Sequence, residues 1–168
     1  MPETADADFA RFVVAQGPRL VRLATLLTGN RFDGEDAVQE AMIALRRAWP
    51  RVRPGTAAAY ARKAVVRKAL DVIAGRREVA VQDVPDTAVF DARLLRYEED
   101  RAFFERLASV PGQQRAVLVL RYYADFDDRT IARLLHCTTS TVRSQAARAL
   151  RRLRREALAR EQTEGAER

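Results

Sequence analysis

The side chains best suited to chemistry in this sequence are guanidinium groups gathered near its C-terminal end. Residues 139–160 hold seven arginines and one acid, Glu156. Guanidinium groups bind phosphates and guanine edges bidentately, so this excess predicts contact with nucleic acid. The alternative is an ordinary solvated helix face in a chain that favours arginine, since 28 of its 30 cationic residues are arginines. The local excess beside a tight turn favours the nucleic-acid interpretation.

The sequence gives little evidence for a metal site or a catalytic site. His136 and Cys137 are adjacent, but the sequence has no other Cys or His to complete a four-ligand zinc site. We therefore predict no metal and no cofactor, and interpret Cys137 as a packing residue. A Gly-rich phosphate loop, an HExxH motif and a nucleophile–base pair are all missing from the sequence. The chain is predicted not to be an enzyme.

The arginine cluster belongs to a predicted helix-turn-helix motif within residues 127–155. Asp127 is a suitable N-cap for a short first helix, and Thr138 or Thr139 can cap the second. In such motifs the second helix enters the DNA major groove and its N-terminal residues reach base edges. The apolar positions, at helical spacing, are Ile131, Leu134 and Leu135, followed by Val142, Ala146, Ala149, Leu150, Leu153 and Ala157.

The whole chain is predicted to be all-α, because strand-type alternation is rare and Ala and Arg are abundant. Its 168 residues allow one domain or two small ones. A net charge of +7 and a pI near 10.4 suggest a polyanionic partner. We expect no membrane insertion, because no apolar run approaches the roughly 20 residues of a membrane span. The single cysteine suits a reducing cytosol, so a cytoplasmic location is expected.

The N-terminal half is predicted to begin with two amphipathic helices. Residues 1–8 are expected to be frayed, residues 9–27 helical with a kink or break at Gly17-Pro18, and Gly29-Asn30 a stop signal. The second helix is expected over residues 33–49, capped by Asp33 and ended by Pro50.

The remaining segments are predicted as follows. A loop over residues 51–55 leads to a third helix from Thr56 to about Gly75, which carries many cations. Residues 78 to about 90 are acidic and aperiodic and are interpreted as a linker. Further helices are expected over residues 91–108 and 113–123, separated by Val110-Pro111-Gly112, and residues 161–168 are expected to be a disordered tail.

Two stretches in this order resemble a bacterial RNA polymerase sigma factor of the extracytoplasmic-function type. The first is DGEDAVQEAMIALRRAW (33–49) followed by AYARKAVVRKALD (59–71), which resembles region 2. The second is LASVPGQQRAVLVLRYYADFDDRTIARLLHCTTSTVRSQAARALRRLR (107–154), which resembles region 4. The resemblance implies a region-2-like domain of three to four helices (1–77), a flexible acidic linker (78–93), a region-4-like helix-turn-helix domain (94–160) and a tail (161–168).

The resemblance also implies partners and roles. The partners are promoter DNA and core RNA polymerase, through its beta-prime and beta subunits, and an anti-sigma factor stays open as a further partner. Polymerase binding falls to Asp36, Gln39, Glu40, Arg46 and Arg47. Minus-10 recognition falls to Arg51, Arg53, Tyr60, Arg62, Lys63 and Arg67. Minus-35 recognition falls to Thr139, Ser140, Thr141, Arg143, Ser144 and Arg148.

The residues suit these roles in physical terms. Cations that track phosphates and an aromatic surface for an extruded base suit single-stranded DNA, for which Tyr60 is a candidate, although a Tyr beside an apolar face is often a core residue. A bidentate Arg–guanine contact discriminates by about 1–3 kcal/mol. Arg151, Arg152, Arg154 and Arg155 lie later on the helix and are expected to meet phosphates.

The sequence departs from the family pattern at three positions. Members often have Asn at the position of Arg67 and Gly at the positions of His136 and Ser140. Two other functions stay open. One is a free-standing helix-turn-helix regulator with a helical sensing or dimerisation domain, and the other is a silent adaptor that uses its arginines for solubility.

Overall fold

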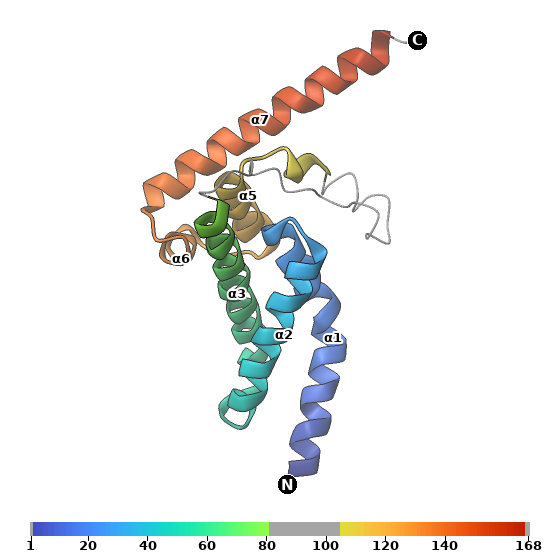
Figure 1. The fold of residues 1–168 in the computed structure, drawn as a ribbon, viewed down its shortest axis with the longest axis vertical. Helices are drawn as coiled ribbons and strands as arrows, with labels where there is room; N and C mark the ends of the chain where they lie inside the picture. The colour runs from blue at the N-terminus through green and yellow to red at the C-terminus, as the bar shows by residue number, and fades with distance from the viewer. Residues whose placement is uncertain (1, 81–104, 167–168) are drawn as a thin grey trace. The chain divides into compact units, whose positions relative to one another are not determined.

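The computed structural model describes residues 2–80 and 105–166, apart from the side chains of residues 2–4, 54, 77–80 and 164–166. The chain divides into two compact units, residues 1–94 and 95–168, each of which contains helices that are drawn in Figure 1. Every regular element in the described ranges is helical, which confirms the all-α, two-domain fold class. None of the described helices combines the length and apolar character that a bilayer crossing requires.

The first unit is a bundle of three helices: α1 (Pro2–Thr28), α2 (Arg31–Ala48) and α3 (Ala57–Ala80) (Figure 1). Two 3-10 turns, η1 (Trp49–Arg51) and η2 (Pro54–Thr56), connect α2 to α3. Each helix contributes a stripe of small and aliphatic residues to one core, as amphipathic spacing predicts. The core residues are Leu20, Leu23, Ala24, Leu26 and Leu27, then Ala37, Val38, Ala41 and Leu45, then Ala61, Val65, Val66 and Ala69.

The helix α1 begins earlier than predicted, and the break that was one of the two alternatives at Gly17-Pro18 is absent. Its described helix begins at Pro2, so residues 2–8 are helical rather than frayed, and an ion pair between Asp6 and Arg46 joins this end to α2. The helix also continues through Pro18 without a break. Pro18 and Val14 are exposed, so the Val14 carbonyl that loses its N–H partner can be hydrated instead.

The turn between α1 and α2 corrects the predicted cap. Gly29 has φ 71°, the left-handed conformation that ends helices, so the expected stop signal is confirmed. Asn30 then takes an extended conformation, and its Oδ1 accepts from the N–H groups of Phe32 and Asp33 at 2.8 and 3.3 Å. Asn30 is therefore the N-cap, and Asp33 lies inside the helix.

Two contacts fix how these three helices cross. A Cβ on Gly34 would lie 2.6 Å from Thr25 Oγ1 and 2.8 Å from Thr25 N, so α1 and α2 meet at a point where only glycine fits. On the other side, Arg76 of α3 donates from Nη1 to the Thr28 carbonyl at 3.1 Å and forms an ion pair with Asp33. Arg76 therefore gives a backbone carbonyl at the end of α1 a hydrogen-bond donor and also neutralises a carboxylate in the first turn of α2.

The third helix runs further than predicted. It extends through Ala80 rather than ending near Gly75, so residues 78–80 of the predicted linker are helical. A Cβ added to Gly75 would have no neighbour within 4 Å, so this glycine lies in open surroundings and exerts no constraint. The rest of the predicted linker and the beginning of the predicted helix 91–108 lie outside the described residues.

The second unit comprises a helical end at residues 105–108, then α5 (Gly112–Leu118), the π-helical turn η4 (Val119–Tyr123), α6 (Asp128–Leu134) and α7 (Thr139–Ala166). The expected break at Val110-Pro111-Gly112 is confirmed. The core lies where α5, η4 and α6 pack on the first half of α7. Its residues are Leu107, Val110, Ala116, Val117, Leu118, Val119, Leu120, Ile131, Val142, Ala146 and Ala149.

The end of α7 overturns two predictions. Residues 161–166 continue the helix rather than forming a disordered tail, because residues 139–164 of α7 include no helix-breaking Pro or Gly. Ala157, expected on the apolar face, is exposed, because α5 and α6 cover only the earlier turns of α7 (Figure 1).

Candidate nucleic-acid and protein-binding surfaces

The predicted helix-turn-helix is present as α6, a turn over residues 135–138 and α7. Asp127 caps α6 as expected, accepting from the Thr130 N–H at 2.7 Å. Hydrogen bonds from the Thr130 side chain, then from its backbone N–H, lower the pKa of Asp127 below its ordinary value. Thr138 rather than Thr139 is the cap of α7, because its Oγ1 accepts from the Thr141 N–H at 3.1 Å.

The turn itself depends on a left-handed residue. His136 has φ 51°, and the following Cys137 N–H donates to the Ala132 carbonyl at 2.9 Å, as in a Schellman helix end. Glycine would adopt this conformation at no steric cost. The departure at His136 therefore adds local strain but leaves the geometry of the turn intact.

The exposed face of α7 contains most of the predicted base-reading residues. Ser140, Ser144 and Arg148 follow one another at helical spacing and are all exposed, opposite the buried Val142 and Ala146. Thr139 and Thr141 are half-buried at the edge of this face, and the Thr141 hydroxyl lies 2.8 Å from Thr138 Oγ1.

Sequence reasoning missed Ala147, which is exposed between Ser144, Arg148 and Arg151. A small apolar side chain on a groove-facing surface can contact a thymine methyl group. The helical period places Ala147 on the outward face, so its exposure was predictable from the sequence. It was missed because only polar and charged side chains were considered as base contacts.

Arg143 lies on the flank of this face, beside α6. Its Nε is 3.2 Å from Oδ2 of Asp128, and Arg121 of η4 contacts the same carboxylate at 3.0 Å. The Arg143 side chain is nevertheless 69% exposed. Its head is therefore held at one nitrogen and open at the other end.

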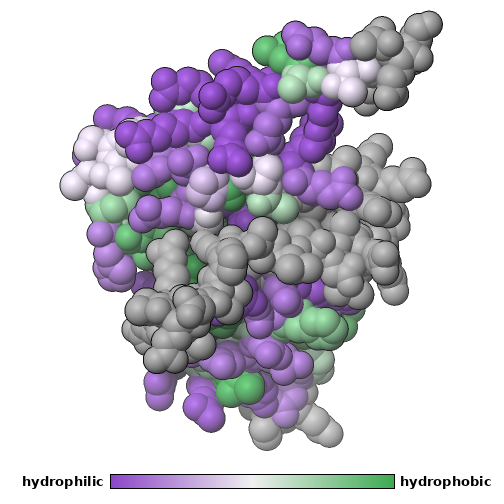
Figure 2. Space-filling view, turned by 45° about the horizontal axis from the view of Figure 1, so that its top comes forward, coloured by the Kyte–Doolittle hydropathy of each residue, from purple (hydrophilic) through white to green (hydrophobic). Residues whose placement is uncertain are grey.

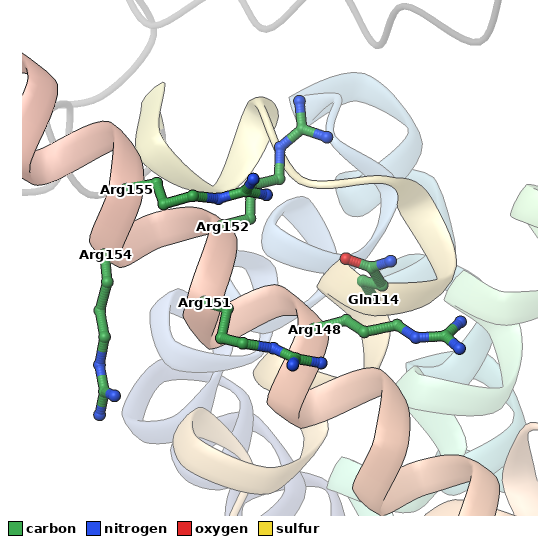
Figure 3. A pocket seen from close by; sticks show the side chains of 6 residues that line it. All are labelled: Gln114, Arg148, Arg151, Arg152, Arg154 and Arg155. Carbon is green, nitrogen blue, oxygen red and sulfur yellow. The ribbon is translucent and has the colours of Figure 1, made fainter.

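Further along α7, arginines surround a shallow pocket whose other wall is Gln114 of α5 (Figure 3). Figure 3 shows Arg148 lying beside Gln114, while Arg154 points away from the others. Figure 2 shows hydrophilic residues gathered along α7 at the top of the view. Closely spaced guanidinium groups favour a polyanion. The arginines that line the pocket are Arg148, Arg151, Arg152, Arg154 and Arg155.

In the first unit, α3 exposes a stripe of Tyr60, Lys63 and Arg67, at i, i+3 and i+7. Tyr60 is 47% exposed, so it is not a core residue. Arg62 does not join the stripe, because its position in the helical period falls on the packed side between Ala61 and Val65, and it is only partly exposed.

The two loop arginines of the predicted minus-10 set are both exposed. Arg51 ends the turn η1, and Arg53 precedes η2. The predicted minus-10 residues other than Arg62 therefore form two groups. One is Arg51 and Arg53 in the connection between α2 and α3, and the other is the exposed stripe of α3.

The α2 surface combines polar and apolar groups. Asp36 and Gln39 are exposed, and at helical spacing they lie between Phe32 and Ile43, which are 67% and 55% exposed. Sequence reasoning missed both apolar residues, although the spacing 32, 36, 39, 43 places all four on one face. A solvent-exposed Phe and Ile among polar residues is typical of a protein-binding surface.

The other predicted polymerase-binding residues differ in how far they are engaged. Glu40 pairs with Lys68 of α3 at 2.9 Å. Arg46 pairs with Asp6 and lies over the Phe9 ring, 5.6 Å from its centroid. Arg47 is exposed and has no ion pair among the described residues. Arg47 is therefore more available to a partner than Arg46.

No cluster of three or more His, Cys, Asp or Glu suited to a metal ion occurs in the described ranges. Cys137 is a half-buried free thiol in the turn between α6 and α7.

Two family models match the chain in sequence order. The model "Sigma-70 region 2" matches residues 12–79, and the model "Sigma-70, region 4" matches residues 100–153. The first covers the three-helix unit from residue 12 onward, and the second covers α5, η4, α6 and the packed half of α7.

Curated relatives align over most of the chain. An RNA polymerase sigma-E factor of Streptomyces avermitilis is 29% identical over 153 residues, covering 89% of this chain and 84% of that protein. One from Streptomyces coelicolor is 28% identical over 158 residues, covering 92% and 88%. The RNA polymerase sigma factor SigV of Bacillus subtilis is 27% identical over 134 residues, covering 79% and 81%.

A solved structure shares the fold. The sigma factor RpoE of Bartonella quintana, crystallised in complex with the anti-sigma factor NepR, superposes with a TM-score of 0.62 at 21% identity. The match covers 88% of this chain and 95% of that one.

Proposed function

The chain belongs to the sigma-70 family, and we propose how its two helical units divide the work of a promoter-specificity subunit. The chain is a sigma factor of the extracytoplasmic-function type that directs core RNA polymerase to promoters. The observation that carries this function is the presence of region 2 and region 4 matches, in that order, in one chain. A free-standing regulator would need only the second.

We propose that the exposed stripe of α2 binds the polymerase. Its exposed Phe32 and Ile43 offer two apolar contacts, and Asp36 and Gln39 between them offer polar contacts, a mixture that protein interfaces use. Glu40 and Arg47 lie beside it, whereas Arg46 is engaged in packing α1 on α2.

We assign the minus-10 element to the connection between α2 and α3 and to the exposed face of α3. Arg51, Arg53, Lys63 and Arg67 supply cations for the phosphates of a single strand, and Tyr60 supplies an exposed ring on which a base can stack. Arg62 supports the helix from its packed side and is left out of this surface.

The minus-35 element falls to the outward face of α7. Ser140, Arg143, Ser144 and Arg148 lie near the N-terminal end of the helix, where a helix-turn-helix protein reaches base edges. The pocket arginines that follow Arg148 on α7 add phosphate contacts that raise affinity for any sequence.

Three further features complete the proposal. An anti-sigma factor is a proposed partner, because the structurally similar RpoE was solved bound to one. The protein acts together with the polymerase in the cytoplasm and has no catalytic activity of its own.

Two variants separate the assigned surfaces. Arg143→Ala is expected to reduce discrimination at a minus-35 base by about 1–3 kcal/mol while core binding persists. Gln39→Ala combined with Glu40→Ala is expected to weaken core binding while the fold is retained. Binding to labelled core enzyme and competition between promoter duplexes measure the two effects.

The matched control is Arg160→Ala, which removes one guanidinium from the exposed far end of α7. It should change neither base preference nor core binding. If Arg143→Ala and Arg160→Ala behave alike, Arg143 reads no base.

A further inference from the structure

Asp128 is the centre of a three-residue ion-pair network in the second unit. Arg121 Nη2 lies 3.0 Å from Oδ1 and 3.1 Å from Oδ2 of Asp128, and Arg143 Nε lies 3.2 Å from Oδ2. The Asp128 side chain is 17% exposed, against 69% for Arg143. Asp128 is therefore largely enclosed, whereas Arg143 is accessible to solvent or to a ligand.

The three residues come from three different elements. Asp128 is the first residue of α6, Arg121 belongs to the π-helical turn η4, and Arg143 lies on α7. Because Arg121 contacts both carboxylate oxygens, Asp128 has an anchor that does not depend on Arg143. The position of the Arg143 head is therefore set by η4 and α6 as well as by its own helix.

The contact uses only part of the Arg143 guanidinium. Its Nε donates to Asp128, and the described residues offer no hydrogen bond to its terminal Nη1 and Nη2 groups. Recognition of guanine O6 and N7 by arginine needs two N–H donors side by side. The terminal pair supplies them, and a head already fixed at Nε has less rotamer freedom to lose on binding.

We propose that Asp128 is a positioning residue for base recognition, which fixes Arg143 with its terminal amino groups free for one base of the duplex. This inference rests on the proposed role of Arg143. The negative charge of Asp128 would also repel DNA phosphates that approach this surface. Removing its charge should therefore lower base preference while maintaining or raising sequence-independent affinity.

The test uses holoenzyme reconstituted from core polymerase and the full chain. The probe is a pool of duplexes randomised over the upstream contact region, and the bound fraction is sequenced. With the wild-type chain, one position should show a base preference of about 5- to 150-fold that Arg143→Ala abolishes. Asp128→Asn should reduce the preference at that same position by about threefold or more. Binding of the whole pool should stay equal or rise.

Three further variants make the result specific. Asp127→Asn removes the same charge one residue away and keeps a good N-cap, and it should leave every position unchanged. Asp128→Asn added to Arg143→Ala should have no further effect on the affected position. Arg121→Gln releases the carboxylate from its other side and should reduce the same preference, which covers the case in which Asp128→Asn fails to fold.

The outcomes are distinguishable. If Asp128→Asn and Arg121→Gln leave the preference at the Arg143 position intact, or weaken all positions equally together with thermal stability, Asp128 has only a structural role. The function proposed for Arg143 would still stand in that case. If Arg143→Ala flattens no position, or the wild-type holoenzyme enriches no sequence, both the inference and the assigned role of Arg143 are wrong.

Discussion

Lys68 of α3 and Glu40 of α2 form an ion pair, with Lys68 Nζ 2.9 Å from Glu40 Oε2. The pair joins the helix assigned to polymerase binding to the helix assigned to the minus-10 element. Glu40 is 64% exposed on its side chain, so a partner protein can still reach it. A change at Glu40 therefore affects both an interface and a contact within the unit.

The ion pair predicts how Lys68 titrates. The hydrogen bond to Glu40, and then the charge of Glu40, raise the pKa of Lys68 above its ordinary value of 10.5. Because the folded pKa is raised, the contribution to stability is complete below pH 10.5 and is lost as the pH rises through the folded pKa. Glu40→Gln should return the Lys68 pKa toward 10.5, as followed by NMR of the side-chain resonances. Identical titration curves in the two proteins would show that the pair does not form in solution.

Gly34→Ala should destabilise the first unit. The added Cβ would lie within 3.0 Å of backbone and side-chain atoms of Thr25, and the backbone of α1 would have to move. Overpacking of this kind costs about 1–3 kcal/mol, more than alanine gains in helix propensity. Urea unfolding followed by circular dichroism measures the difference. The matched control is Gly75→Ala, which meets no neighbour and should stabilise by about 0.5–1 kcal/mol; equal effects of the two changes would contradict the close crossing.

His136→Gly should stabilise the second unit. The left-handed backbone at φ 51° costs a non-glycine residue about 1–2 kcal/mol, part of which is offset by the greater freedom of glycine in the unfolded chain. A net gain of about 0.5–1 kcal/mol is expected in thermal unfolding, and the β-branched change His136→Val should lower stability. A loss of stability with glycine would mean that the imidazole makes a contact that outweighs the strain.

Phe32→Ala and Ile43→Ala should each weaken binding to core polymerase. Both side chains are largely exposed in the free protein, so their removal costs little stability but deletes apolar area from the interface. A decrease of about tenfold in affinity for each is expected by fluorescence anisotropy. Val14→Ala removes an equally exposed apolar group from α1 and should have no effect. The interface is elsewhere if all three variants bind as the wild type does.

Local signals in the sequence were sufficient for much of the fold. The Asp127 cap, the apolar spacing around Ile131 and Val142, and the stop at Gly29 all act within one or two helical turns, and the structure confirms each. Such short-range features depend on few neighbours. They were enough to place α6 and α7.

The remaining features depend on contacts between distant residues. Asn30 and Asp33 are both good N-caps, and Asn30 prevails because the left-handed Gly29 ends α1 immediately before it. Arg62 and Lys63 are both cations, and the burial of Ala61 and Val65 against the neighbouring helices decides which of the two lies on the packed side. The network of Asp128 with Arg121 and Arg143 joins residues of three different elements, so the period of a single helix does not predict it.

The central claim is that this chain confers promoter-specific initiation on a polymerase that lacks it. The most direct measurement is run-off transcription with purified core enzyme, the purified chain and genomic DNA fragments. Discrete transcripts that require the chain, and whose start sites share upstream and downstream sequence elements, are the predicted result. Failure to produce any transcript beyond those of the core enzyme alone, with a folded chain shown to be present, would contradict the assignment.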